Sequence, residues 1–127
     1  MMKADFSVGQ VWKYKTRPHE SESEITIVAI DSDSELGNIV HIYVADVDIP
    51  NPKAPQGKTS FIGHLPYSAE ALQESVTELV GTADSLPDFE DGYNLWKSAF
   101  DAGEAGAFEV AVAEAIAGVE KLSLIHI

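Results

Sequence analysis

The most strongly β-forming segment of this chain is Ile39-Val40-His41-Ile42-Tyr43-Val44-Ala45-Asp46-Val47. Both alternate sets of side chains in this segment are largely apolar, and β-branched residues recur along it. Such a pattern is typical of a strand that is covered on both faces. We therefore expect this segment to lie inside a sheet, with another strand on each side of it.

Strand patterns also occur before and after this segment. Residues 10–17 alternate strictly, with aromatic and β-branched side chains on one face, and residues 25–30 form a short apolar run. Turn-forming residues fill positions 31–38, and three prolines exclude a helix or an inner strand from residues 49–57. Residues 59–65 follow this rigid loop, and we expect them to form an edge strand.

The second half of the chain favours helices. Ser68 has the position of an N-cap, and we expect the helix that it begins to end at Gly81. Aromatic side chains recur with helical spacing between residues 88 and 102, which predicts a second helix. The residues on the buried side of that helix would be Phe89, Tyr93, Trp96 and Phe100.

We expect a short fifth strand at residues 108–112 and a third helix over residues 113–121. Strands therefore come first and helices follow. This order favours an α+β fold, namely an antiparallel sheet of four to five strands with two to three helices packed on one face.

Residues 1–121 are expected to form a single domain, because a chain of this length can bury a sufficient core. The final segment, Leu122-Ser123-Leu124-Ile125-His126-Ile127, matches the in-frame translation of a transposon sequencing adapter. We expect this tail to be foreign and to replace the native C-terminus. The alternative is an ordinary apolar C-terminal strand.

Several classes of protein are disfavoured by composition. The chain has no cysteine, which excludes disulfides, thiolate zinc sites and cysteine nucleophiles. Its first residues lack the apolar run of a signal peptide, and its longest apolar stretch is too short to span a bilayer. We therefore expect a cytoplasmic protein that does not bind membranes.

Acidic residues are concentrated in the second half of the chain. Residues 64–120 contain twelve acidic side chains and one lysine, and the formal net charge of the whole chain is −13. A field of this sign attracts cationic partners and repels nucleic acid. We therefore expect a basic protein partner and no nucleic acid. The residues expected to bind this partner are Glu70, Glu74, Glu78, Glu90, Asp91 and Asp101.

A second hypothesis is a pocket for a small ligand between the sheet and the proline-rich loop. Its candidate lining residues are His41, Tyr43, Lys58 and His64. The spacing of Asp46 and Asp48 is compatible with a divalent metal, but it is not specific, so no metal ligand and no cofactor are assigned. The Gly57-Lys58-Thr59 segment lacks the glycine and the helix of a phosphate-binding loop.

Four segments of this chain resemble small bacterial proteins of similar length that have no known activity. These segments are Gly9-Gln10-Val11-Trp12-Lys13-Tyr14-Lys15-Thr16-Arg17-Pro18, Pro50-Asn51-Pro52, His64-Leu65-Pro66-Tyr67-Ser68 and Pro87-Asp88-Phe89-Glu90-Asp91-Gly92-Tyr93. The resemblance extends over most of residues 9–120 and implies a stand-alone cytoplasmic bacterial protein. It implies no catalytic residue, ligand or partner.

Taken by itself, the sequence favours a non-enzymatic module that binds a basic protein, as inhibitors and immunity proteins do. The first alternative is a small enzyme or metabolite-binding domain that uses the His41 and His64 pocket. The second alternative is a soluble domain whose acidity has no binding role. No serine lies in the strained, glycine-flanked turn that a serine nucleophile requires. The sequence does not predict the oligomeric state.

Overall fold

Four strands follow one another as an antiparallel meander in the computed structural model, which describes residues 5–125 and their side chains as far as Lys121. The strands are β1 (Gln10–Tyr14), β2 (Glu24–Asp33), β3 (Gly37–Pro50) and β4 (Lys58–Ser68), and the short 3-10 helix η1 (Pro18–Glu20) connects the first two. β3 has β2 on one side and β4 on the other, so the apolar segment at residues 39–47 lies inside the sheet as expected.

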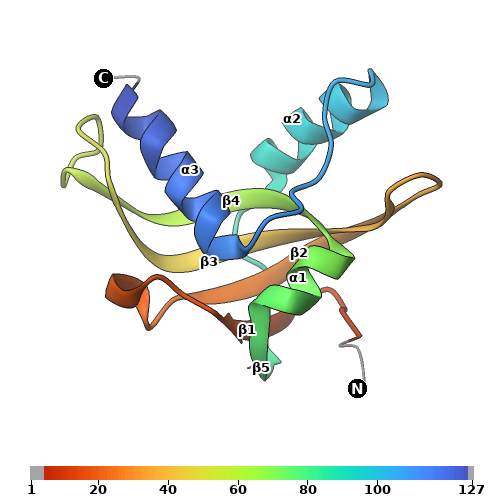
Figure 1. Ribbon diagram of the computed structural model, residues 1–127, viewed down its shortest axis with the longest axis horizontal. Helices are drawn as coiled ribbons and strands as arrows, with labels where there is room; N and C mark the ends of the chain where they lie inside the picture. The colour runs from red at the N-terminus through yellow and green to blue at the C-terminus, as the bar shows by residue number, and fades with distance from the viewer. Residues whose placement is uncertain (1–4, 126–127) are drawn as a thin grey trace.

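The fifth strand closes the opposite edge of the sheet. After β4, the helix α1 (Ala69–Ser75) leads to β5 (Val76–Thr82), which pairs with β1, and the strand order is β4-β3-β2-β1-β5 (Figure 1). All four strand pairs are antiparallel. The helices α2 (Glu90–Asp101) and α3 (Val112–Ile125) follow, so the α+β class is confirmed.

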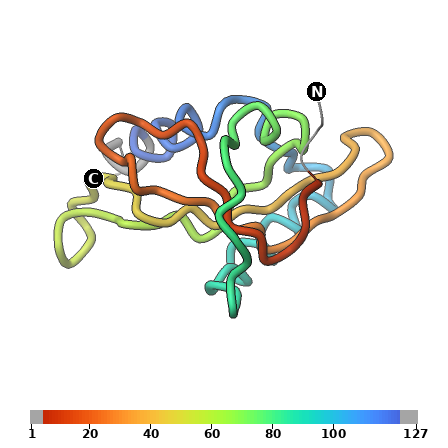
Figure 2. Tube along the Cα trace, turned by 90° about the horizontal axis from the view of Figure 1, so that it is seen from below, coloured from red at the N-terminus to blue at the C-terminus, as the bar shows by residue number. Residues whose placement is uncertain are grey.

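The helices divide between the two faces of the sheet. The main core lies on one face, where Leu72 of α1 and Val112 and Ile116 of α3 pack with strand residues such as Ile27 and Ile42. Two helices, α1 and α3, therefore pack on one face of the sheet, in agreement with the expected two to three. α2 packs on the other face, where its Trp96 contacts His41. In Figure 2, α1 and α3 lie on one side of the strands and the segment leading into α2 projects from the other.

Two of the expected elements are wrong. The helix expected to reach Gly81 ends at Ser75, and the next seven residues form β5. The fifth strand expected at residues 108–112 is not formed; Phe108 makes a single parallel bridge to Tyr67, and α3 begins at Val112. In both places, hydrogen bonds to residues distant in the chain override the local pattern, because β1 and β4 each offer unpaired backbone groups at an edge.

The C-terminal part of the chain is described only in part. The backbone of α3 continues to Ile125, whereas His126 and Ile127 of the expected foreign tail lie outside the described residues. Within residues 5–125, none of the helices has the length and apolarity needed to cross a membrane.

Candidate functional site

His41 lies in the middle of β3 and is completely buried. Its neighbours Val40 and Ile42 point into the main core, so the alternation of a strand directs His41 to the other face. That face is covered by α2. A buried imidazole requires hydrogen-bond partners, and the structure provides one for each ring nitrogen.

A continuous chain of hydrogen bonds passes through His41. Its Nδ1 atom is 2.8 Å from His64 Nε2, and its Nε2 atom is 2.9 Å from Asp31 Oδ2. The hydroxyl of Tyr93 donates to the same Asp31 oxygen at 2.9 Å. Strands β2, β3 and β4 therefore contribute one residue each to the chain, and α2 contributes the fourth.

The positions of the protons follow by elimination. The Asp31 carboxylate only accepts, so His41 Nε2 carries a proton and donates it. His41 Nδ1 of the neutral ring must then accept the proton on His64 Nε2, which leaves His64 Nδ1 without a proton. No described residue forms a hydrogen bond with His64 Nδ1 that would require a proton on this atom.

Both imidazoles are held in the neutral form. Burial lowers the pKa of His41, and the opposing effect of Asp31 does not compensate fully. Burial, with a smaller contribution from His41, lowers the pKa of His64 to about 4. At neutral pH the only formal charge in the hydrogen-bonded chain is the carboxylate of Asp31.

Aromatic rings of α2 enclose the histidines. The ring centroids of Trp96 and Tyr93 lie 4.6 and 4.9 Å from that of His41, and both rings meet it edge to face. Trp96 Nε1 donates to the Gly106 carbonyl at 2.8 Å. Of the four residues in the expected aromatic stripe, Trp96 is buried. The other three, Phe89, Tyr93 and Phe100, are half-exposed.

A shallow hollow of about 290 Å³ adjoins His64 at the start of α2. Its lining includes Ile62, Gly63, Asp88, Phe89, Asp91 and Gly92. Within the described part of the chain, no group of three histidine or acidic side chains is arranged to hold a metal ion.

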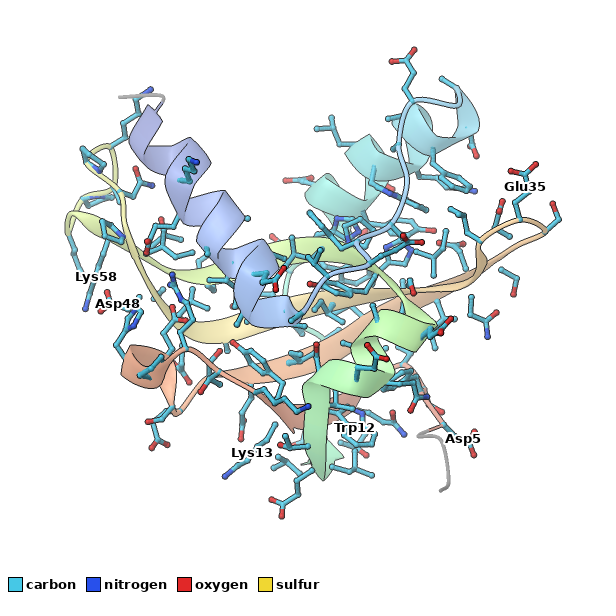
Figure 3. The ribbon with its side chains drawn as sticks, viewed as in Figure 1. Asp5, Trp12, Lys13, Glu35, Asp48 and Lys58 are labelled. Atoms are coloured by element: carbon cyan, nitrogen blue, oxygen red, sulfur yellow. The ribbon has the colours of Figure 1, made fainter. Side chains whose placement is uncertain are left out.

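The structure brings together two of the four residues expected in the ligand pocket, His41 and His64. Tyr43 lies on the same face of β3 but stacks on Phe61, with ring centroids 5.6 Å apart. Lys58 is exposed at the start of β4, where it pairs with Pro50 at the far end of the sheet. Figure 3 shows Lys58 at the end of the molecule opposite Glu35.

The acidic residues occupy several surfaces. Glu70 and Glu74 lie on α1, and with Glu35 and Glu109 they line two adjoining hollows of about 460 and 280 Å³, which we call the acidic groove. The two hollows share Ser68, Glu70 and Glu109, and none of their lining residues is basic. Sequence reasoning missed Glu35 and Glu109, because it placed one in a turn and the other in a strand.

The remaining expected partner residues lie elsewhere. Glu78 is on β5 at the opposite edge of the sheet. Glu90 and Asp91 occupy the first turn of α2, on the other face, where carboxylates also favour the helix dipole. Asp101, at the end of α2, forms an ion pair with Lys97 at 3.2 Å. Only Glu70 and Glu74 of the six therefore belong to the acidic groove.

Comparisons with known proteins give no match to this chain, whether with family models, curated proteins or solved structures.

Proposed function

We propose that this protein is a non-enzymatic module that binds a cationic protein or peptide at the acidic groove, in the manner of an inhibitor or immunity protein. The observation that supports this proposal is the set of four carboxylates, Glu35, Glu70, Glu74 and Glu109, around two adjoining hollows without a basic lining residue. Lysine and arginine side chains fit such a surface because they donate hydrogen bonds and carry the opposite charge.

The shape of the groove favours long side chains over a compact metabolite. Leu36 lines the larger hollow and is 43% exposed, so it offers an apolar contact to the methylene stem of a lysine or an arginine. The groove is only partly enclosed, whereas pockets for small molecules usually enclose most of their ligand. The net charge of −13 would also accelerate encounter with a cationic partner.

The experiment compares two double variants with the same net charge. Glu70→Gln/Glu109→Gln removes two carboxylates from the acidic groove, and Glu90→Gln/Glu78→Gln removes two exposed carboxylates elsewhere. Glu70 and Glu90 both lie in the first turn of a helix, so loss of the favourable dipole interaction is matched. The probe is a short oligoarginine peptide, and its dissociation constant is measured by calorimetry.

We expect the groove variant to weaken binding about tenfold and the matched variant to weaken it less than about threefold. Binding of the wild-type protein should also fall steeply between about 50 and 500 mM NaCl, because salt screens exposed charges. Equal losses in the two variants would show that net charge alone attracts the peptide. Binding that is insensitive to salt would likewise reject the proposal.

A further inference from the structure

α2 is held against the sheet chiefly through the Asp31–His41–His64 chain. Trp96 is the one buried residue among the described residues of α2, and it packs on His41. Tyr93 adds its hydrogen bond to Asp31, whereas Leu95 is 77% exposed. Residues 83–89 and 102–111, which are largely irregular, connect α2 to its neighbours. The attachment of this helix therefore depends on a small cluster of polar and aromatic groups.

The cluster accepts a first additional proton without losing a hydrogen bond. The proton can enter at His64 Nδ1 while His64 Nε2 passes its own proton to His41 Nδ1. His41 is then a cation that donates to both Asp31 and His64, and every nitrogen–oxygen or nitrogen–nitrogen contact still has one donor and one acceptor. The carboxylate of Asp31 neutralises the new charge.

A second proton cannot be accommodated. With both rings protonated, His41 Nδ1 and His64 Nε2 would each carry a hydrogen and face each other at 2.8 Å. Two cationic rings would also lie with their centroids 5.0 Å apart, in a partly buried region where water screens their repulsion only in part. The contact between the rings would have to open, and His64 packs directly against Gly92 of α2.

We propose that the Asp31–His41–His64 chain is an acid-sensitive latch, which holds α2 on the sheet at neutral pH and releases it when both histidines are protonated. Release would expose His41, which is completely buried in the latched form, together with Trp96, which packs on it. Acid would thus uncover an aromatic surface on the face of the sheet opposite α1 and α3.

The surrounding charges set the direction of the effect. Asp31 faces His41 from β2; from α2, Tyr93, Lys97 and Asp101 act on the cluster, and Asp88 and Asp91 border His64. Since the pKa of His64 is lowered from 6.5 to about 4, the released form binds more protons than the latched form between these values. Latching is therefore strongest above pH 6.5 and weakens as the pH falls, by roughly 150-fold in the equilibrium constant at pH 4. The lowered pKa of His41 acts in the same direction.

Amide hydrogen exchange of the whole chain, measured by NMR between pH 4 and 7 and corrected for intrinsic rates, tests the latch. We expect the protection of α2 amides to fall by about 100-fold or more from pH 7 to 4, while α3 changes less than about tenfold. Nitrogen shifts of the imidazoles at neutral pH should show a proton on His64 Nε2 and none on Nδ1. Unchanged protection of α2 at pH 4, or simultaneous loss across all three helices, would overturn the proposal.

The variant His64→Gln separates protonation from packing. Its side-chain amide can donate to His41 Nδ1 but does not titrate, so the pH dependence of α2 protection should shrink to the smaller part that His41 contributes. An undiminished dependence would contradict the latch. The matched control, His19→Gln, alters an exposed histidine in η1 and should keep the pH dependence of α2 protection.

If His64→Gln does not fold, Tyr93→Phe provides the test, because it removes one hydrogen bond and both histidines remain. Its α2 should be less protected at pH 7 but show the same pH dependence, and a lost dependence would refute the proposal.

Discussion

Tyr14 and Tyr67 are both buried in the main core, but only one of their hydroxyl groups has a partner. The hydroxyl of Tyr14 lies 2.8 Å from Ser23 Oγ, whereas that of Tyr67 has no hydrogen-bond partner among the described residues. We expect Tyr67→Phe to leave the free energy of unfolding unchanged or to raise it by up to about 1–2 kcal/mol, because a buried polar group without a partner is lost. Urea unfolding at pH 7 measures the difference.

Tyr14→Phe is the matched control for Tyr67→Phe. It removes the same hydroxyl from a comparably buried ring, yet it breaks a hydrogen bond, so it should lower the free energy of unfolding by about 1 kcal/mol. If Tyr67→Phe destabilised the protein as much as Tyr14→Phe does, the hydroxyl of Tyr67 would have to be engaged in the folded protein.

Gly92 and Gly118 are helical glycines in different surroundings. A Cβ atom on Gly92 would lie 2.9 Å from the Cβ of His64, which is fixed to the backbone of β4, whereas one on Gly118 would meet nothing within 4 Å. Helix propensity favours alanine over glycine by about 1 kcal/mol at both positions. We therefore expect Gly118→Ala to stabilise the protein by about 0.5–1 kcal/mol and Gly92→Ala to give no gain or a loss. Thermal unfolding of both variants checks this; equal gains would show that α2 does not press on His64.

The histidines also show how far residue-level reasoning from the sequence extends. The strand patterns placed His41 and His64 on neighbouring strands and grouped them correctly. They could not identify Asp31, because a register shift between Ile27 and Ala29 sets which β2 side chains share the face of His41. The helical spacing places Tyr93 in an aromatic stripe, but its hydrogen bond to Asp31 depends on how α2 is placed on the sheet.

At the level of elements, a buried ion-pair network joins η1 to β3 and α3. The Glu20 carboxylate accepts hydrogen bonds from Arg17 Nε and Nη2 at 2.7 Å and from the backbone N–H of Asp48 at 2.6 Å. Arg17 also contacts Glu120 of α3 at 3.3 Å. Burial opposes ionisation of Glu20, but the bonds from Arg17 and Asp48 outweigh it and lower the pKa of this carboxyl below 4.5.

We expect Glu20→Gln to lower the free energy of unfolding by about 2–3 kcal/mol at pH 7, because it removes charge-assisted hydrogen bonds from a buried site. The contribution of Glu20 is fully present above pH 4.5 and is lost as the pH falls through its lower folded pKa. The difference between wild type and variant should therefore shrink below pH 4.5 in urea titrations. The control Glu22→Gln, in the exposed part of the same turn, should change stability by less than about 0.5 kcal/mol. A pH-independent difference would contradict this account.

The α1–β5 segment shows why some elements could not be predicted. Leu72, Val76 and Leu79 have helical spacing, so the local pattern favours one continuous helix. In the structure, Val76 and Leu79 pair with β1, and Ser75 Oγ accepts the N–H of Val112 at 3.2 Å, at the first residue of α3. Both partners are distant in sequence, and a window of adjacent residues carries no information about them.

At the scale of the whole molecule, the sequence predicts the excess of acidic charge but not its distribution. The count of carboxylates in residues 64–120 predicts a single acidic surface on two helices. Because α1 and α2 lie on opposite faces of the sheet, the structure divides these carboxylates between both faces and the β5 edge. The acidic groove instead combines α1 with Glu35 and Glu109, and the fold alone brings these residues together.

The excess of like charge predicts the response of the whole protein to salt. With a net charge of −13, and with Arg17 and Lys97 as the only described lysine or arginine side chains in ion pairs, repulsion between carboxylates should destabilise the folded state. Raising NaCl from about 10 to 200 mM shortens the screening length from roughly 30 to 7 Å. We therefore expect the free energy of unfolding at pH 7 to rise by about 1 kcal/mol, as measured by urea titration.

If the repulsion is concentrated in the acidic groove, Glu70→Gln/Glu109→Gln should reduce this salt effect more than Glu90→Gln/Glu78→Gln. A free energy of unfolding that falls with salt would mean that the ion pairs of Arg17 outweigh the repulsion between carboxylates. The carboxylates of the acidic groove would then not destabilise the folded protein, and a bound cation would relieve no repulsion there.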